Sequence, residues 1–147
     1  MRHTLRFFLG FALAIGANSS TVASPKGLQF VQIRNISFQV EVVRSSDEWM
    51  KGLMFRDRLG EKEGMLFFGK EVRRQSFWMK NTPVSLDIIY ISKDLRIDSI
   101  QKNTEPLSEK PLPSKGPALH VLEIVAGSSD RHGFREGDKV IFRGIPR

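Results

Sequence analysis

The stretch Ser85-Leu86-Asp87-Ile88-Ile89-Tyr90-Ile91 is a short apolar run, and runs of this length are typical of β-strands. Similar runs occupy residues 64–69, 75–80 and 95–101, the last after a turn at Asp94. The run at 64–69 is bracketed by glycines, which predicts a strand buried on both faces. In chain order, these four runs predict a β-meander.

Two further strands are expected upstream, at residues 28–33 and 36–43, joined by a turn at Arg34-Asn35. The second strand alternates apolar and polar residues, which is typical of a half-buried strand. The spacing of apolar residues then changes from that of a strand to that of a helix. Ser45 and Glu48, at the point of change, fit a capping box. We therefore expect a helix over about residues 46–55. Its apolar stripe consists of Trp49, Met50, Leu53 and Met54.

Residues 103–117 contain four prolines and predict a loop. Strands at 119–125 and 139–143 follow, with a short helix at 129–134 between them. Seven or eight short strands and one well-marked helix predict a single small α+β domain, mostly β, with a barrel-like sheet and one packed helix. Closure of the barrel would remove exposed strand edges.

Residues 1–23 have the features of a secretory signal peptide. Two arginines precede an uncharged apolar core at 7–17, and Thr21-Val22-Ala23 offers a cleavage site. The core is shorter than the roughly 20 residues of a membrane-spanning helix. We therefore expect an exported, periplasmic domain of residues 24–147 without a stable membrane span after cleavage. An uncleaved N-terminal anchor is the alternative.

The composition narrows the classes of partner. The chain has no cysteine, so it holds neither a disulfide nor a thiolate metal site. Its formal net charge is +7, and cleavage after residue 23 would leave +5. The basic residues are dispersed, with no run longer than Arg73-Arg74, and we expect no nucleic-acid partner for an exported protein of this kind. A weak preference for anionic surfaces or ligands is all that the charge implies.

The run Phe77-Trp78-Met79-Lys80-Asn81-Thr82-Pro83 is the first candidate site. Three hydrophobes lead into an ammonium, an amide and a hydroxyl, as in a small-molecule or peptide site. Trp78 either packs in the core or forms a stacking wall for a planar ligand. Lys80 either lies in solvent at a strand end or contacts a ligand. Asn81 and Thr82, before a proline, also fit a simple turn.

Asp87 and Glu123 each lie between apolar residues of an expected strand. A carboxylate there must be paired, hydrogen-bonded or on a wet face. For Asp87, the structural interpretation is a pair with Arg56 or Lys80, or hydrogen bonds from the backbone of residues 81–82. The catalytic interpretation makes either carboxylate a general base whose pKa is raised by burial. The structural interpretation is favoured for both.

Arg56 is explained by its position after the helix, where the macrodipole stabilises a cation. If Arg56 turns inward instead, it would join Lys80, Asp87 and Glu123 in a mixed-charge pocket for an anionic or zwitterionic ligand.

No metal site and no cofactor are expected. His120 and His132 lack a partner at ligand spacing, and neither a phosphate loop nor a nucleophile motif occurs. Methionine thioethers offer ligands for Cu(I) in an exported protein, but the spacing of Met50 and Met54 fits core packing better.

Several short motifs together resemble the DUF192 family, also called UPF0127, over about residues 30–142. They are Gly52-Leu53-Met54-Phe55-Arg56, Gly64-Met65-Leu66-Phe67-Phe68, Phe77-Trp78-Met79-Lys80-Asn81-Thr82, Leu86-Asp87-Ile88-Ile89-Tyr90, Val121-Leu122-Glu123 and Gly137-Asp138. The resemblance implies a compact β-rich domain, often exported in bacteria, with no established biochemical function.

We therefore expect an exported binding or accessory module with a pocket near residues 78–82 and Asp87, for a small molecule or a peptide. The alternative is a cell-envelope hydrolase or other acid–base enzyme that uses Asp87 or Glu123. A purely structural role, in which residues 106–117 engage a partner protein, is a third possibility. The oligomeric state stays open.

Overall fold

The computed structural model describes residues 27–146, and the expected signal peptide at 1–23 lies outside this range. None of the helices in the described part is long and apolar enough to cross a membrane. Nine strands and two short helices are formed by residues 27–146. In chain order they are β1 (Phe30–Ile33), β2 (Ile36–Val43), α1 (Ser46–Lys51), β3 (Glu63–Phe67), β4 (Arg73–Phe77), β5 (Leu86–Ile91), β6 (Ile97–Gln101), β7 (Leu112–Ala118), β8 (His120–Val125), α2 (Ser128–Arg131) and β9 (Val140–Arg143).

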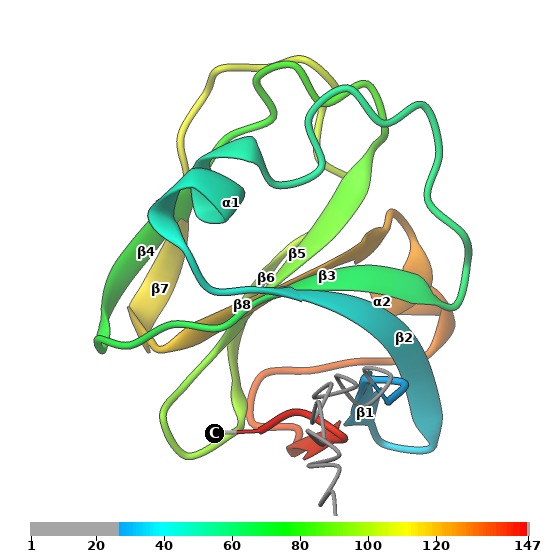
Figure 1. Cartoon of the computed structure of the whole chain (residues 1–147), viewed down its shortest axis with the longest axis vertical. Coiled ribbons are helices and arrows are strands. Elements are labelled where there is room, and N and C mark those ends of the chain that lie inside the picture. The colour runs from blue at the N-terminus through cyan, green and yellow to red at the C-terminus, as the bar shows by residue number, and fades with distance from the viewer. Residues whose placement is uncertain (1–26, 147) are drawn as a thin grey trace, which may run out of the picture.

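Seven strands form one sheet that curls into a half-barrel, in the order β6-β5-β8-β3-β2-β1-β9 (Figure 1). β2 and β3 are parallel, and every other pair of neighbours in this sheet is antiparallel. A parallel pair needs a long crossover connection, which α1 and the chain after it supply. The prediction of a mostly β, barrel-like α+β domain is confirmed.

The half-barrel is joined across one end, between the chain before β6 and the chain before β9. A single β-bridge pairs Arg96 with Lys139, and the Val140 N–H donates to the Leu95 carbonyl at 2.8 Å. These bonds satisfy backbone groups that would otherwise lie on open strand edges.

β4 and β7 form a separate two-stranded ribbon, so the expected β-meander is wrong. β3 pairs with β2 and β8, whereas β7 is the only strand of residues 27–146 that pairs with β4. The expected loop at 103–117 is also partly wrong, because β7 contains Pro113 and Pro117. Proline has no backbone N–H to donate, so strands accept it only at sheet edges and bulges. This ribbon has such an irregularity, because its register shifts between Arg74 and Ser76.

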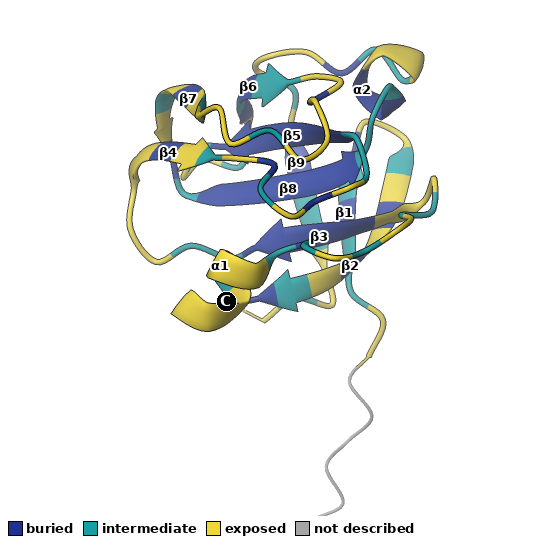
Figure 2. Ribbon diagram, turned by 90° about the horizontal axis from the view of Figure 1, so that it is seen from above, coloured by how far each residue is buried: buried dark blue, intermediate teal, exposed yellow. Residues whose placement is uncertain are grey.

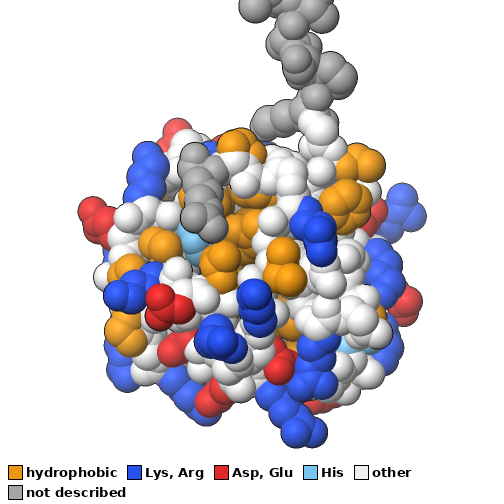
Figure 3. Space-filling view, turned by 90° about the horizontal axis from the view of Figure 1, so that it is seen from below, with side chains coloured by type: hydrophobic (Ala, Val, Ile, Leu, Met, Phe, Trp, Pro, Cys, Tyr) orange, Lys and Arg blue, Asp and Glu red, His pale blue; other side chains and the backbone are white. Residues whose placement is uncertain are grey.

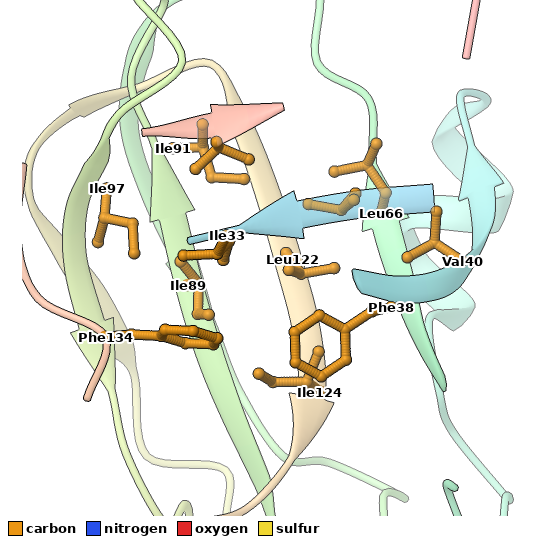
Figure 4. Packing of buried hydrophobic residues seen from close by; sticks show 12 residues of the cluster. Ile33, Phe38, Val40, Leu66, Ile89, Ile91, Ile97, Leu122, Ile124 and Phe134 are labelled. Carbon is orange, nitrogen blue, oxygen red and sulfur yellow. The ribbon is translucent and has the colours of Figure 1, made fainter. Parts of the chain in front are cut away.

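Two hydrophobic clusters lie on the two faces of the central strands. Leu122 and Ile124 of β8 belong to the first cluster, in which Phe38 and Phe134 also pack (Figure 4). Val121 of β8 belongs to the second, on the side of α1. Figure 2 shows β3, β5 and β8 buried almost throughout, whereas α1 is exposed. Burial on both faces explains why these three strands read as near-continuous apolar runs.

α1 begins with the expected capping box and ends four residues before the expected end. The Glu48 N–H donates to Ser45 Oγ at 3.3 Å, and the Ser45 N–H donates to Glu48 Oε2 at 2.9 Å. The helix stops at Lys51 because Gly52 adopts a φ of 45° with a ψ of −131°, a combination that is open to glycine and strained for other residues. Met50 of the expected apolar stripe is 71% exposed, so it is not a core residue.

Candidate functional site

A cleft of about 250 Å³ lies between α1 and β4. Figure 1 shows α1 packed on the β4 side of the curled sheet. Phe67 of β3 and Glu123 of β8 come from the sheet and form the floor of the cleft. The other lining residues are 49–54 on one wall, and Arg73, residues 75–78 and Thr82 on the other.

Three aromatic rings shape the cleft. Trp49 of α1 meets Phe67 edge to face with ring centroids 5.4 Å apart, and Phe67 meets Phe77 of β4 in the same way at 4.9 Å. Such pairs contribute about 0.5–1.5 kcal/mol each beyond the area they bury. The rings therefore fasten α1 and β4 to the sheet. Sequence reasoning included Phe77 only as part of the apolar lead into the candidate run. It missed Phe67 as a site residue, because nothing distinguishes Phe67 from other apolar strand residues.

Glu123 places a buried carboxyl at the floor. It is directly opposite Ile88 of β5, on the side of the second hydrophobic cluster, and it is only 4% exposed. Among residues 27–146 the Glu123 carboxyl has no hydrogen-bond or ion-pair partner. Burial raises its pKa to about 8, because apolar surroundings disfavour the charged form. The carboxyl therefore largely keeps its proton at neutral pH.

Tyr90 of β5 lies close to Glu123 beneath the cleft. Burial raises the pKa of Tyr90, and the charge of Glu123 raises it further. The phenol donates a hydrogen bond to the Leu112 carbonyl of β7. The phenol keeps its proton and donates it in the hydrogen bond to the Leu112 carbonyl, so Tyr90 does not supply a base. Its role is to link β5 to the β4–β7 ribbon.

The turn after β4 is fastened to the loop after α1 through its backbone. Asn81 has a left-handed φ of 54°, and its carbonyl accepts the Phe55 N–H at 2.7 Å. Thr82 is buried and lines the cleft, and its hydroxyl donates to the Lys80 carbonyl at 3.1 Å. Asn81 and Thr82 thus form a turn, as one of the two interpretations expected, and of the two only Thr82 lines the cleft.

Trp78 is not a core residue, because it is 45% exposed and lines the cleft. Lys80 lies outside the cleft. Its Nζ is 5.1 Å from the centroid of the Trp78 ring and 3.7 Å from the Glu109 carboxylate. An exposed indole beside a cleft is available for stacking on a ligand.

Asp87 is fully buried on the opposite face of the sheet from Glu123. Its carboxylate accepts backbone N–H groups from Asn103 at 2.9 Å, Gly127 at 3.3 Å and Ser129 at 2.8 Å. The last two donors lie at the start of α2, which is shorter than expected and has no side-chain cap of its own. Asp87 therefore caps α2 from a neighbouring strand and has a structural role.

The expected mixed-charge pocket is not formed. Arg56 turns towards Glu41 of β2, and its Nη2 lies 2.6 Å from Glu41 Oε2. Their hydrogen bonds lower the pKa of Glu41 and raise that of Arg56. Lys80 lies at the rim and Asp87 on the far face, so of the four charged candidates only Glu123 lines the cleft.

A second hollow of about 390 Å³ adjoins the cleft and shares three lining residues with it, Trp49, Arg73 and Gln75. Arg44 and Lys70 also line this hollow. The two hollows together form one groove along α1, with the Glu123 carboxyl at the floor of one part and both basic side chains and Glu71 around the other.

The histidines of the described residues do not belong to a cluster of metal-ligating side chains, and Met50 and Met54 both line the cleft. No three His, Asp or Glu side chains there gather as metal ligands. The Gly69 N–H donates to Nδ1 of His120 at 3.2 Å. Burial, and secondarily the charge of Arg44, lower the pKa of His120 to about 4. Met65 and Met79 are buried in the second cluster.

Figure 3 shows basic and acidic side chains interspersed on the lower face, around a group of apolar ones.

Comparisons with known proteins find one matching family model and similar solved structures. The family model DUF192, described as "Uncharacterized ACR", matches residues 29–142. A crystal structure of a protein of unknown function from Novosphingobium aromaticivorans is 41% identical, with a TM-score of 0.74, and the match covers 90% of this chain and 99% of that one. A putative transcription regulator from Sinorhizobium meliloti is 34% identical, with a TM-score of 0.76, over 80% of this chain and 95% of that one. No curated protein matches the sequence.

Proposed function

We propose that this chain, which belongs to the DUF192 family, is an exported binding module that holds a small molecule or a peptide in the cleft between α1 and β4. The observation that carries the proposal is the unpartnered carboxyl of Glu123 at the floor of that cleft. A carboxyl that is largely removed from solvent and has no protein partner is costly, and a ligand or a reaction at the cleft is one explanation for its presence.

The surface around the cleft supports the same proposal. Met50 and Trp78 line the cleft and remain exposed, and Phe55, on the loop fastened to Asn81, is exposed as well. Large apolar side chains gathered beside a concave site are typical of binding surfaces. Export rests on the N-terminal 23 residues, which have the charge, apolar core and cleavage site of a signal peptide.

The test is a ligand screen by thermal shift on the protein expressed with its own N-terminal segment and purified from the cell envelope. Sugars, amino acids and short peptides are compared on the wild type and on Glu123→Gln. We expect one class to raise the melting temperature of the wild type, and to raise that of the variant less. Glu105→Gln, an exposed glutamate away from the cleft, is the matched control. If no ligand changes the wild-type melting temperature, the binding proposal fails.

A second candidate is an acid–base enzyme of the cell envelope with Glu123 as its proton-transfer group. The observation in its favour is the pKa of about 8, since a group that titrates near neutrality transfers protons effectively. Hydrolysis of envelope substrates with a pH–rate profile centred near that value, abolished by Glu123→Gln, would support it. Ligand binding without turnover would favour the binding module.

A further inference from the structure

β4 has a free edge that faces the cleft. It pairs with β7 along one edge, and no described strand pairs with the other. The cleft is lined by the consecutive residues Gln75, Ser76 and Phe77. Gln75 is buried, Ser76 is exposed and the ring of Phe77 packs on Phe67, although a register shift at Gln75 interrupts the regular alternation of the strand. Consecutive residues line one cleft when it runs along the edge of a strand. α1 forms the opposite wall, so the cleft has the form of a slot between a strand edge and a helix.

The floor of this slot fits a cationic side chain. The Glu123 carboxyl is buried, lacks a partner among residues 27–146, and lines the slot beside the rings of Trp49, Phe67 and Phe77. An ammonium group gains from a carboxylate and from the faces of aromatic rings together. A lysine also has a slender apolar stem, which can pass between such rings while its head reaches the carboxylate.

We propose that the slot takes an extended peptide segment, which adds to the free edge of β4 and places a lysine side chain over Glu123. This deepens the proposed binding function and rests on it. The backbone of the segment would bond to β4 as a further strand, and the lysine would supply the side-chain specificity. The adjoining hollow beside Trp49 and Arg73 leaves room for the residues on one side of the lysine.

Charge at the slot makes binding depend on pH. Besides Glu123, the charged residues that line the slot are Lys51 and Arg73, both exposed, and Tyr90 lies beneath the slot with its proton retained. An ammonium over Glu123 favours the carboxylate, so binding should release a proton below pH 8. Affinity for a lysine peptide should therefore rise between pH 6 and pH 9, where lysine itself stays charged.

The test is calorimetric titration of the envelope-purified protein with the peptide Ac-Ala-Val-Lys-Val-Ala-NH2 and with the same peptide carrying norleucine in place of lysine. We expect the lysine peptide to bind about tenfold more tightly at pH 9, with a smaller preference at pH 6. Glu123→Gln should remove the preference, and Glu105→Gln should keep it. The wild-type comparison of the two peptides stands even if Glu123→Gln does not fold.

Amide hydrogen exchange with and without the lysine peptide tests the strand addition. We expect exchange to slow in β4, at residues 73–77, on binding. Equal affinity for both peptides overturns the lysine inference and leaves the cleft as a binding site. Tight binding without slowed exchange in β4 overturns the strand addition. If sugars or amino acids bind but neither peptide does, the peptide inference fails and the proposed binding function stands. If no ligand binds at all, both the peptide inference and the proposed function fail.

Discussion

Asp87 and Glu123 lie on neighbouring strands but point to opposite faces of the sheet. Asp87 of β5 is directly opposite Ile124 of β8, and Glu123 is directly opposite Ile88. Both carboxylates are buried, yet three backbone N–H groups bind Asp87, whereas Glu123 has no partner in the described part of the chain. The same local pattern, an acid between apolar strand residues, thus produces a structural anchor on one face and a candidate binding group on the other.

Glu123 should lower the stability of the protein as the pH rises. Its pKa of about 8 lies above the ordinary 4.5, so the folded state keeps a proton that the unfolded state has lost between these values. Its contribution to the free energy of unfolding therefore falls from pH 4.5 to pH 8, by roughly 3–5 kcal/mol in all. Urea unfolding at pH 5, 7 and 9 should show Glu123→Gln gaining stability over the wild type as the pH rises. A difference in the free energy of unfolding between Glu123→Gln and the wild type that stays constant with pH would contradict this. The control Glu105→Gln should match the wild type at all three pH values.

His120 should have the opposite effect at lower pH. Its pKa of about 4 lies below the ordinary 6.5, so the unfolded state binds a proton that the folded state does not. Stability from His120 is complete above pH 6.5 and is lost as the pH falls towards 4, by roughly 3 kcal/mol. The slopes of His120 and Glu123 should cancel between pH 4.5 and 6.5. His120→Gln should therefore show stability that falls with rising pH already from pH 4.5, and a flat profile there would contradict the assignment.

Asp87→Asn should destabilise the fold without altering the cleft. The substitution replaces a carboxylate that accepts three backbone N–H groups by an amide with one acceptor oxygen. We expect a loss of about 2–4 kcal/mol in the free energy of unfolding, and faster amide exchange at Asn103 and Ser129. Asp94→Asn, in an exposed turn, is the control and should change stability by less than about 0.5 kcal/mol. A stability loss no larger than that of the control would show that Asp87 does not anchor these segments.

Arg56→Ala should have a small effect that salt reduces further. The side chains of Arg56 and Glu41 are 38% and 59% exposed, and a pair of this kind contributes about 0–1 kcal/mol. Chemical unfolding at low and high ionic strength measures this difference. Ligand binding in the cleft should be unchanged, because Arg56 turns away from it. A loss of binding in Arg56→Ala would place Arg56 in the site.

The fold class could be predicted from the sequence because its signals are local. Apolar runs predicted β3 and β5, and Ser45 with Glu48 predicted the start of α1. Strand order could not be predicted in the same way. The pairing of β4 with β7 depends on contacts between segments about 40 residues apart, and Pro113 and Pro117 disguised β7 as a loop.

The candidate site was predicted in part. Lys80, Asn81 and Thr82 stood out as polar residues after an apolar run, yet Asn81 and Thr82 mainly form a turn, and Lys80 lies outside the cleft at its rim. Asp87 and Glu123 were indistinguishable in sequence, because the face to which a strand residue points is decided by its partners. The wall formed by α1 and the floor residue Phe67 gave no local signal, because residues that line a cleft between two elements have the same apolar pattern as core residues.

The pKa of Glu123, measured by ¹³C NMR titration of its side-chain carboxyl, tests the central claim most directly. A buried carboxyl without a partner at the floor of the cleft should titrate near pH 8 in the free protein, and at a lower pH when the lysine peptide is bound. A pKa near 4.5 that does not change on addition of the peptide would contradict both the burial of this charge and its role in binding.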